Sequence, residues 1–171
     1  PLPLETPDSW RKGLAEVLDI GQHNSIEIWF HQILENAQSN APEHKEEHQF
    51  ETVELAGYVS GDLDDDDDGI LERTEVVVGT RTMPYKDFID SWMYATMIIN
   101  FHCGGWTQLL ARYSHQSDTE KYRQFYDRLF DCLASDQGPV GDIWRKVESI
   151  IQDYTQGKPS PYSGHTLLWY L

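Results

Sequence analysis

The sequence predicts a mainly α fold, a single-domain bundle of five or six helices with a small β-like or irregular insert around residues 50–82. Three observations support this fold class. Apolar residues recur at helical spacing over most of the 171-residue chain. One segment is instead rich in β-branched residues and glycine. The composition, 39% hydrophobic and 12% aromatic, is sufficient for the core of one domain.

The elements group into three parts of one domain over residues 1–171. We expect an N-terminal helical pair over 6–38 and a C-terminal helical core over 84–171. Between them lies the insert over 50–82, which carries a strongly acidic loop. We find no internal repeat, so the parts should share one core.

The N-terminal pair is predicted from caps and spacing. Thr6 followed by Pro7 is typical of a helix start, and Gly21 ends this first helix. Asn24 and Glu27 then resemble a capping box that opens a second helix. The apolar stripe of this second helix consists of Ile26, Trp29, Phe30, Ile33, Leu34 and Ala37.

The insert differs in composition from the helices. Residues 38–49 are polar and are interpreted as a connection. Valine and threonine then recur from Thr52 to Thr82, interrupted by Gly57, Gly61 and Gly79. This pattern favours two short extended pieces around the acidic loop, arranged as a hairpin.

The C-terminal core returns to helical spacing after Pro84. The apolar face of the first helix there is broad, and consists of Phe88, Ile89, Trp92, Met93, Met97 and Ile98. We expect this helix to be central and to end at Gly104. A short helix through Leu109, a helix opened by a Ser117–Glu120 capping box and a last helix after a turn at 136–139 should follow. Residues 167–171 are apolar enough to dock on the body.

The acidic loop has an ordered spacing of its own. Residues 62–75 read Asp-Leu-Asp-Asp-Asp-Asp-Asp-Gly-Ile-Leu-Glu-Arg-Thr-Glu. With Gly69 at position 6 of a twelve-residue loop, aspartates occupy positions 1, 3 and 5 and an aliphatic Leu71 occupies position 8. This arrangement resembles the EF-hand calcium loop.

The resemblance implies calcium as the bound ion and a set of oxygen ligands for it. Those ligands are Asp64, Asp66, Asp68, the backbone carbonyl of Ile70 and Glu75, with Glu72 binding directly or through water. The flanks depart from the family, because residues 54–61 make a poor helix and 76–79 favour a strand. We therefore expect a lone loop between extended segments; the alternative is a solvated acidic turn that binds nothing.

Two smaller features have a functional and a structural interpretation. The run from His44 to His48 spells H-x-x-E-H and resembles the inverted zinc-protease signature, yet it lies in a polar connection and favours an exposed charged segment. Cys103 and Cys132 are interpreted as two buried thiols, with one disulfide between them as the alternative.

The charge of the chain limits its partners. The formal net charge of −16 disfavours nucleic acids and anionic membranes, and no apolar run is long enough to span a bilayer. The first residues show no signal-peptide pattern, so we expect a soluble chain.

The function we favour from the sequence is a calcium-binding protein in which the ion orders a local surface. The alternative is an acidic inhibitor or immunity-type protein that binds a basic partner through the acidic loop. A third possibility is an enzyme that uses scattered His, Asp and Glu, but no common catalytic motif is present, and no catalytic residue is predicted.

Overall fold

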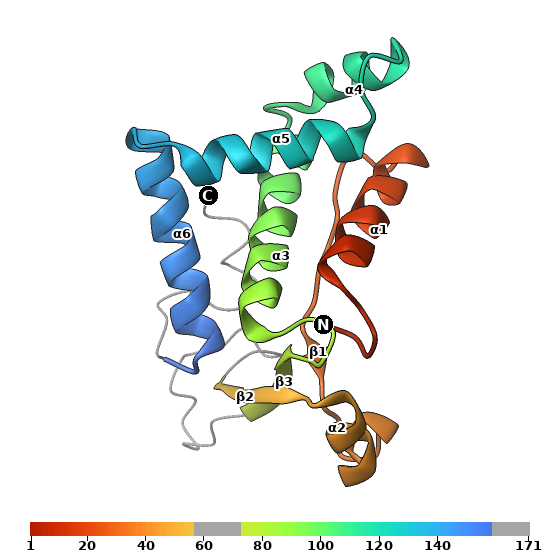
Figure 1. Cartoon of the computed structure of the whole chain (residues 1–171), viewed down its shortest axis with the longest axis vertical. Coiled ribbons are helices and arrows are strands. Elements are labelled where there is room, and N and C mark those ends of the chain that lie inside the picture. The colour runs from red at the N-terminus through yellow and green to blue at the C-terminus, as the bar shows by residue number, and fades with distance from the viewer. Residues whose placement is uncertain (57–72, 159–171) are drawn as a thin grey trace, which may run out of the picture. The chain divides into compact units, whose positions relative to one another are not determined.

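The computed structural model describes residues 1–56 and 73–158, and it confirms the mainly α fold with a small β insert (Figure 1). Two compact units divide the chain and are described separately. Unit 1 takes Pro1–Thr6, Trp29–Ile89 and Ile150–Leu171, and unit 2 takes Pro7–Ile28 and Asp90–Ser149. The single-domain expectation stays a prediction.

Unit 1 contains a three-stranded antiparallel sheet in the order β1-β3-β2 (Figure 1). The strands are β1 (His31–Gln32), β2 (Glu51–Ala56) and the central β3 (Arg73–Gly79). Val76 and Val77 in β3 are 0% exposed, as expected for β-branched side chains in a middle strand.

Strands β2 and β3 confirm the predicted hairpin arrangement in the described part of the insert. Their register pairs Ala56 with Arg73 and Glu54 with Glu75. The acidic segment thus leaves and re-enters the sheet at neighbouring positions. Residues 57–72 themselves lie outside the described residues.

Aromatic side chains form the core of unit 1 beside the sheet. Phe30 contacts Phe88, at the start of α3 (Tyr85–Met97), with ring centroids 5.8 Å apart. It also lies 6.0 Å from the ring of Tyr154, near the end of α6 (Pro139–Thr155). Both contacts are between residues distant in sequence, so this core holds three segments of the chain together.

The predicted second helix over residues 24–37 is wrong. The chain from Ile26 to Phe30 has no regular secondary structure, and its burial alternates, with Ile26, Ile28 and Phe30 more buried than the residues between them. His31 and Gln32 then pair with β3. The apolar residues at 26, 28 and 30 fit the period of a strand as well as that of a helix. Pairing with a distant strand then favoured the non-helical backbone.

The polar connection over 38–49 contains more structure than expected. It holds a short 3₁₀ turn, η1 (Gln38–Asn40), and the seven-residue helix α2 (Pro42–His48). Pro42 stands at the first helical turn, where its missing N–H costs nothing. A helix of seven polar residues has no apolar stripe from which it could be predicted.

Unit 2 is helical throughout its described elements. It contains α1 (Pro7–Asp19), most of α3, the π-helix η2 (Ile98–Cys103), α4 (Gln108–Gln116), α5 (Tyr122–Ser135) and most of α6. These positions confirm the helices predicted outside residues 24–37. The broad apolar face of α3 is buried as expected, since Trp92, Met93, Met97 and Ile98 are at most 4% exposed.

Two local expectations in unit 2 change. At the start of α5 the Gln124 side-chain oxygen accepts from the Lys121 N–H at 3.1 Å, whereas Ser117 donates its hydroxyl back to the Tyr113 carbonyl at the end of α4, at 2.7 Å. Both cysteines are free thiols as predicted, but the predicted burial is wrong for Cys132, which is exposed, while Cys103 is half-buried. No helix in residues 1–56 and 73–158 combines the length and apolar character needed to cross a membrane.

Candidate functional site

The predicted calcium loop is only partly covered by the described residues. Asp64, Asp66, Asp68, Ile70 and Glu72 lie outside them. Glu75, the predicted closing ligand, is described and lies in β3. The structure therefore gives the frame of the loop and the position of its last ligand.

Glu75 has a cationic partner in this structure. The Lys45 ammonium, on α2, donates to both carboxylate oxygens at 3.1 and 3.2 Å. The two side chains are 29% and 33% exposed, so the pair is partly shielded from water. A cation bound at Glu75 would have to replace Lys45, and the base of the hairpin is linked to α2 through this pair.

A buried hydrogen-bond chain lies in unit 2. Nδ1 of His23 is 3.0 Å from Nε2 of His102, and Nδ1 of His102 is 2.5 Å from the Tyr126 hydroxyl. The Thr107 hydroxyl lies 3.1 Å from the same Tyr126 oxygen. All four groups are satisfied when Thr107 donates to Tyr126, Tyr126 to His102, and the second ring nitrogen of His102 to His23.

Burial controls the protonation of this chain. His102 is 0% exposed, and burial, aided by nearby His23 and Arg112, lowers its pKa to about 4. Burial also raises the pKa of Tyr126 well above its usual range. Both groups are therefore neutral near pH 7, which suits a structural network and the recognition of neutral polar groups.

The sequence analysis missed this chain of residues. His23 and His102 are 79 positions apart, and Tyr126 lies 24 positions beyond His102. The bulge of the π-helix η2 places His102 toward the core, and such bulges occur often at functional positions. No local pattern in the sequence indicates either feature.

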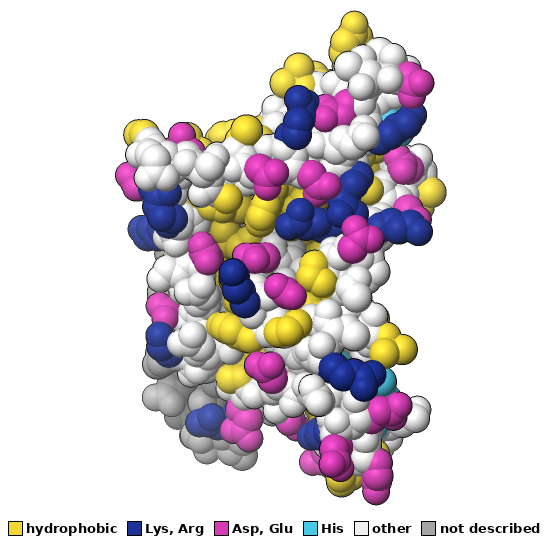
Figure 2. Space-filling model, in the orientation of Figure 1, with side chains coloured by type: hydrophobic (Ala, Val, Ile, Leu, Met, Phe, Trp, Pro, Cys, Tyr) yellow, Lys and Arg dark blue, Asp and Glu magenta, His cyan; other side chains and the backbone are white. Residues whose placement is uncertain are grey.

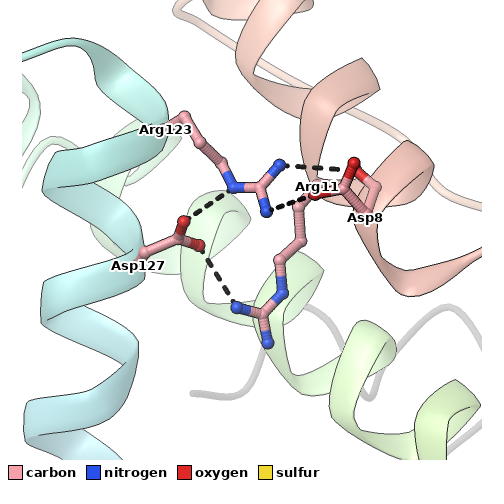
Figure 3. Close-up of polar contacts among 4 residues, drawn as sticks. All are labelled: Asp8, Arg11, Arg123 and Asp127. Carbon is pink, nitrogen blue, oxygen red and sulfur yellow. Dashed lines mark hydrogen bonds and ion pairs between the residues drawn. The ribbon is translucent and has the colours of Figure 1, made fainter.

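A second polar network joins α1 to α5 (Figure 3). Asp127 accepts from Arg11 at 3.2 Å and from Arg123 at 2.7 Å, and Arg123 also donates to the Asp8 carboxylate at 3.0 Å. The Arg11 guanidinium lies over the ring of Tyr94, 4.6 Å from its centroid. Each charge has an opposite partner, so we interpret this network as a structural connection between two helices.

Helix α4 and the turn before it carry an exposed apolar surface, which we call the α4 stripe. Its members are Trp106, Leu109, Leu110 and Tyr113, which are 80%, 76%, 64% and 73% exposed. Leu109, Leu110 and Tyr113 lie on one side of α4, Trp106 lies in the turn just before it, and Ala111 on the other side of the helix is fully buried. Figure 2 shows hydrophobic side chains protruding where α4 lies.

Such a surface needs an explanation, because isolated exposed apolar residues are ordinary but a contiguous row of large ones marks a contact surface. The sequence analysis expected the short helix through Leu109 and Leu110 but not its outward orientation. That orientation depends on which face α5 and η2 cover, which no local pattern shows.

The fold and its surfaces define a mainly helical module with an antiparallel hairpin and an exposed apolar helix. No family model matches the chain. Over 154 residues it is 30% identical to the cobalamin-dependent radical SAM methyltransferase TokK of Streptomyces tokunonensis. The same length and identity relate it to the 2-(S-pantetheinyl)-carbapenam-3-carboxylate methyltransferase of Streptantibioticus cattleyicolor.

The coverage of these matches is unequal. They include 90% of this chain but 22% of each relative. The chain thus spans about a fifth of the length of the curated relatives it matches.

Proposed function

We propose that this chain is one domain of a cobalamin-dependent radical SAM methyltransferase, and that it assembles with the cofactor-carrying part through the α4 stripe. The observation that carries this proposal is the similarity to two methyltransferases, which covers 90% of this chain. A stretch of this size that matches almost from end to end has the dimensions of a domain.

The residues of this chain suit an assembly role better than a cofactor role. Radical chemistry in enzymes relies on cofactors such as cobalamin, S-adenosylmethionine and iron–sulfur clusters. Iron–sulfur clusters are commonly held by four cysteine thiolates, and this chain has two cysteines, Cys103 and Cys132. Cluster ligands would therefore have to come from another part of the enzyme.

The α4 stripe supplies the surface for that assembly. Large apolar and aromatic side chains such as Trp106 and Tyr113 contribute most to binding when a partner covers them. In this structure both are more than 70% exposed. Covering them would remove their apolar surface from water, a favourable change of about 25 cal/mol for each Å².

Purification through a tag on this chain, in the organism that makes it, tests the proposal. Cobalamin, measured by its absorbance, should travel with the tag whether the parts are linked covalently or not. The purified protein should transfer methyl groups from S-adenosylmethionine. Tagged protein without cobalamin and without methyl transfer would contradict the proposal.

Substitutions in the stripe test the assembly surface. Trp106→Ser with Leu110→Ser should weaken the complex by about 2 kcal/mol or more, or slow methyl transfer if the parts are linked, because central aromatic contacts dominate interfaces. The control is Val140→Ser with Ile143→Ser on α6, which are 53% and 61% exposed outside the stripe. Equal effects of both pairs would argue against a specific surface.

We also propose that the acidic hairpin binds calcium. The supporting observation is the register of β2 and β3. It pairs Ala56 with Arg73, so the two residues that flank the acidic segment are neighbours in the sheet. Calorimetric titration should show calcium binding that is stronger than magnesium binding and is lost in Glu75→Gln. Glu43→Gln, an exposed carboxylate of α2, is the control and should bind like the wild type.

The acidic-inhibitor alternative stays a prediction. On the face shown in Figure 2, acidic and basic side chains are intermixed, so the described residues on this face do not favour a single acidic surface. A basic partner should bind less tightly as salt rises, because charge complementarity is screened.

A further inference from the structure

Helix α2 brings three metal-binding side chains together. His44, Glu47 and His48 each offer a ligand atom, and these atoms all lie within 4.8 Å of one another. The two imidazole rings have centroids 4.5 Å apart, because residues four apart share a helix face. Nε2 of His48 is 4.0 Å from the Glu47 carboxylate.

The backbone of α2 is held in place at its end. Gln49 adopts a left-handed conformation that closes the helix, and the Phe50 N–H donates to the Lys45 carbonyl at 3.0 Å. The Arg81 N–H donates to the His48 carbonyl at 2.9 Å. Ligands on a fixed backbone need little rearrangement when an ion binds.

An aromatic side chain lies beside the cluster. The rings of His44 and His48 are 5.7 and 5.9 Å from that of Phe50, and His31 also contacts Phe50 at 5.7 Å. His48 is 8% exposed. Apolar surroundings strengthen metal–ligand attraction by limiting solvent access, while the exposed Glu47 leaves a path for an ion.

We propose that His44, Glu47 and His48 bind a divalent transition metal ion of the zinc type. Two imidazoles and a carboxylate are donors that suit zinc, whereas calcium prefers oxygen ligands alone. Zinc bonds of about 2.0–2.1 Å require donors roughly 3.3 Å apart, a contraction that needs rotation of the half-buried His44 ring as well as of the exposed Glu47 side chain. Three protein ligands leave one tetrahedral position for water or an outside donor.

The site is independent of the methyltransferase and calcium proposals. It uses no residue of the acidic loop and none of the α4 stripe. An ion that joins positions 44 and 48 would stabilise a helix of seven residues, a length that is marginal by itself. In the calcium-free chain, where Lys45 pairs with Glu75, the ion would also stabilise the base of the hairpin.

Zinc titration of the full chain, with excess calcium present to occupy the acidic loop, tests the site. The wild type should bind one zinc ion and melt at a higher temperature when loaded. His44→Gln and Glu47→Gln should each weaken binding by at least about tenfold, since even partners of ligands contribute that much. The control Glu46→Gln, an exposed neighbour on the same helix, should bind like the wild type.

A spectroscopic measurement separates this site from other ligands. X-ray absorption of the zinc-loaded chain should show imidazole ligands at about 2.0–2.1 Å. His48 is buried, so His48→Gln could destabilise the fold, and the test therefore uses His44→Gln and Glu47→Gln. Absence of zinc binding by the wild type, or equal binding by His44→Gln, Glu47→Gln and the wild type, would overturn the proposal.

Discussion

At His102, burial separates the folded pKa from the unfolded one. The side chain is 0% exposed between His23 and Tyr126, and its pKa is lowered to about 4, mainly by burial. In the unfolded chain a histidine titrates near 6.5. The folded protein therefore keeps His102 neutral over a range in which the unfolded chain takes up a proton.

This difference predicts a pH-dependent stability. Between about pH 6.5 and 4 the unfolded chain binds more protons at this site, so the free energy of unfolding should fall as the pH is lowered through that window. For His102 the loss is of order 3 kcal/mol when the window has been crossed. Urea unfolding at several pH values, with metal chelated, measures it.

His102→Gln is the variant that isolates this contribution. Glutamine can hydrogen-bond but does not titrate, so the slope of stability against pH should be shallower than in the wild type over the same window. Parallel curves for His102→Gln and the wild type would show that His102 is not the source.

At this scale the sequence indicated candidate metal ligands but not the residues that contact them in the fold. The H-x-x-E-H run was interpreted as an exposed charged segment, whereas in the fold it lies on α2, His48 is buried, and both imidazoles contact Phe50. Glu75 was predicted as a calcium ligand, yet its ion pair with Lys45 joins residues 30 positions apart. Such pairings depend on tertiary structure, which local spacing does not encode.

At the scale of elements, agreement with the prediction depends on whether local signals compete. Helix α3 has one strong period and no breaker, and it forms where predicted. Residues 26–34 fit both the helical and the strand period, and the backbone partner offered by Val77 to His31 decided between them. Helix α2 is too short for any period to appear.

We expect alanine substitutions at Gly104, which follows the π-helix, and at Gly13 to have opposite effects on stability. A Cβ at Gly104 would lie 2.1 Å from the Asn100 carbonyl oxygen, so Gly104→Ala should lower the free energy of unfolding by at least about 2 kcal/mol. Gly13, inside α1, has nothing within 4 Å of such a Cβ. Gly13→Ala should raise stability by up to about 1 kcal/mol, because alanine favours a helix.

Chemical denaturation of the two variants measures this contrast. The substitution is the same in both, so a general effect of removing a glycine from the unfolded ensemble cancels in the comparison. Equal effects at Gly104 and Gly13 would mean that the chain at Asn100 moves aside at little cost.

At the scale of the whole molecule, composition predicted the class of fold but not the assembly. The apolar content and periodicity indicated a helical core, which the structure has. The apolar content did not reveal the α4 stripe, because exposed and buried apolar residues contribute equally to the composition. The matched stretch is 22% of each relative, and the assembly proposed above would cover this surface.

Net charge is the other whole-molecule property, and its distribution is uneven. Residues 62–75 hold eight carboxylates and Arg73, a net −7 out of the −16 of the chain. Like charges this close repel and reduce stability, so any salt should stabilise the chain to some extent by screening. Screening and specific ion binding therefore have to be separated.

A comparison at constant ionic strength makes that separation. If Asp66 and Glu75 coordinate calcium, replacing sodium with calcium should raise the melting temperature. A bound ion stabilises the folded state by an amount that grows with the logarithm of the free ion concentration. Asp66→Asn should relieve repulsion and yet abolish the rise with calcium. If the wild type melts at the same temperature in both salts, the acidic hairpin is a solvated turn and the calcium proposal is wrong.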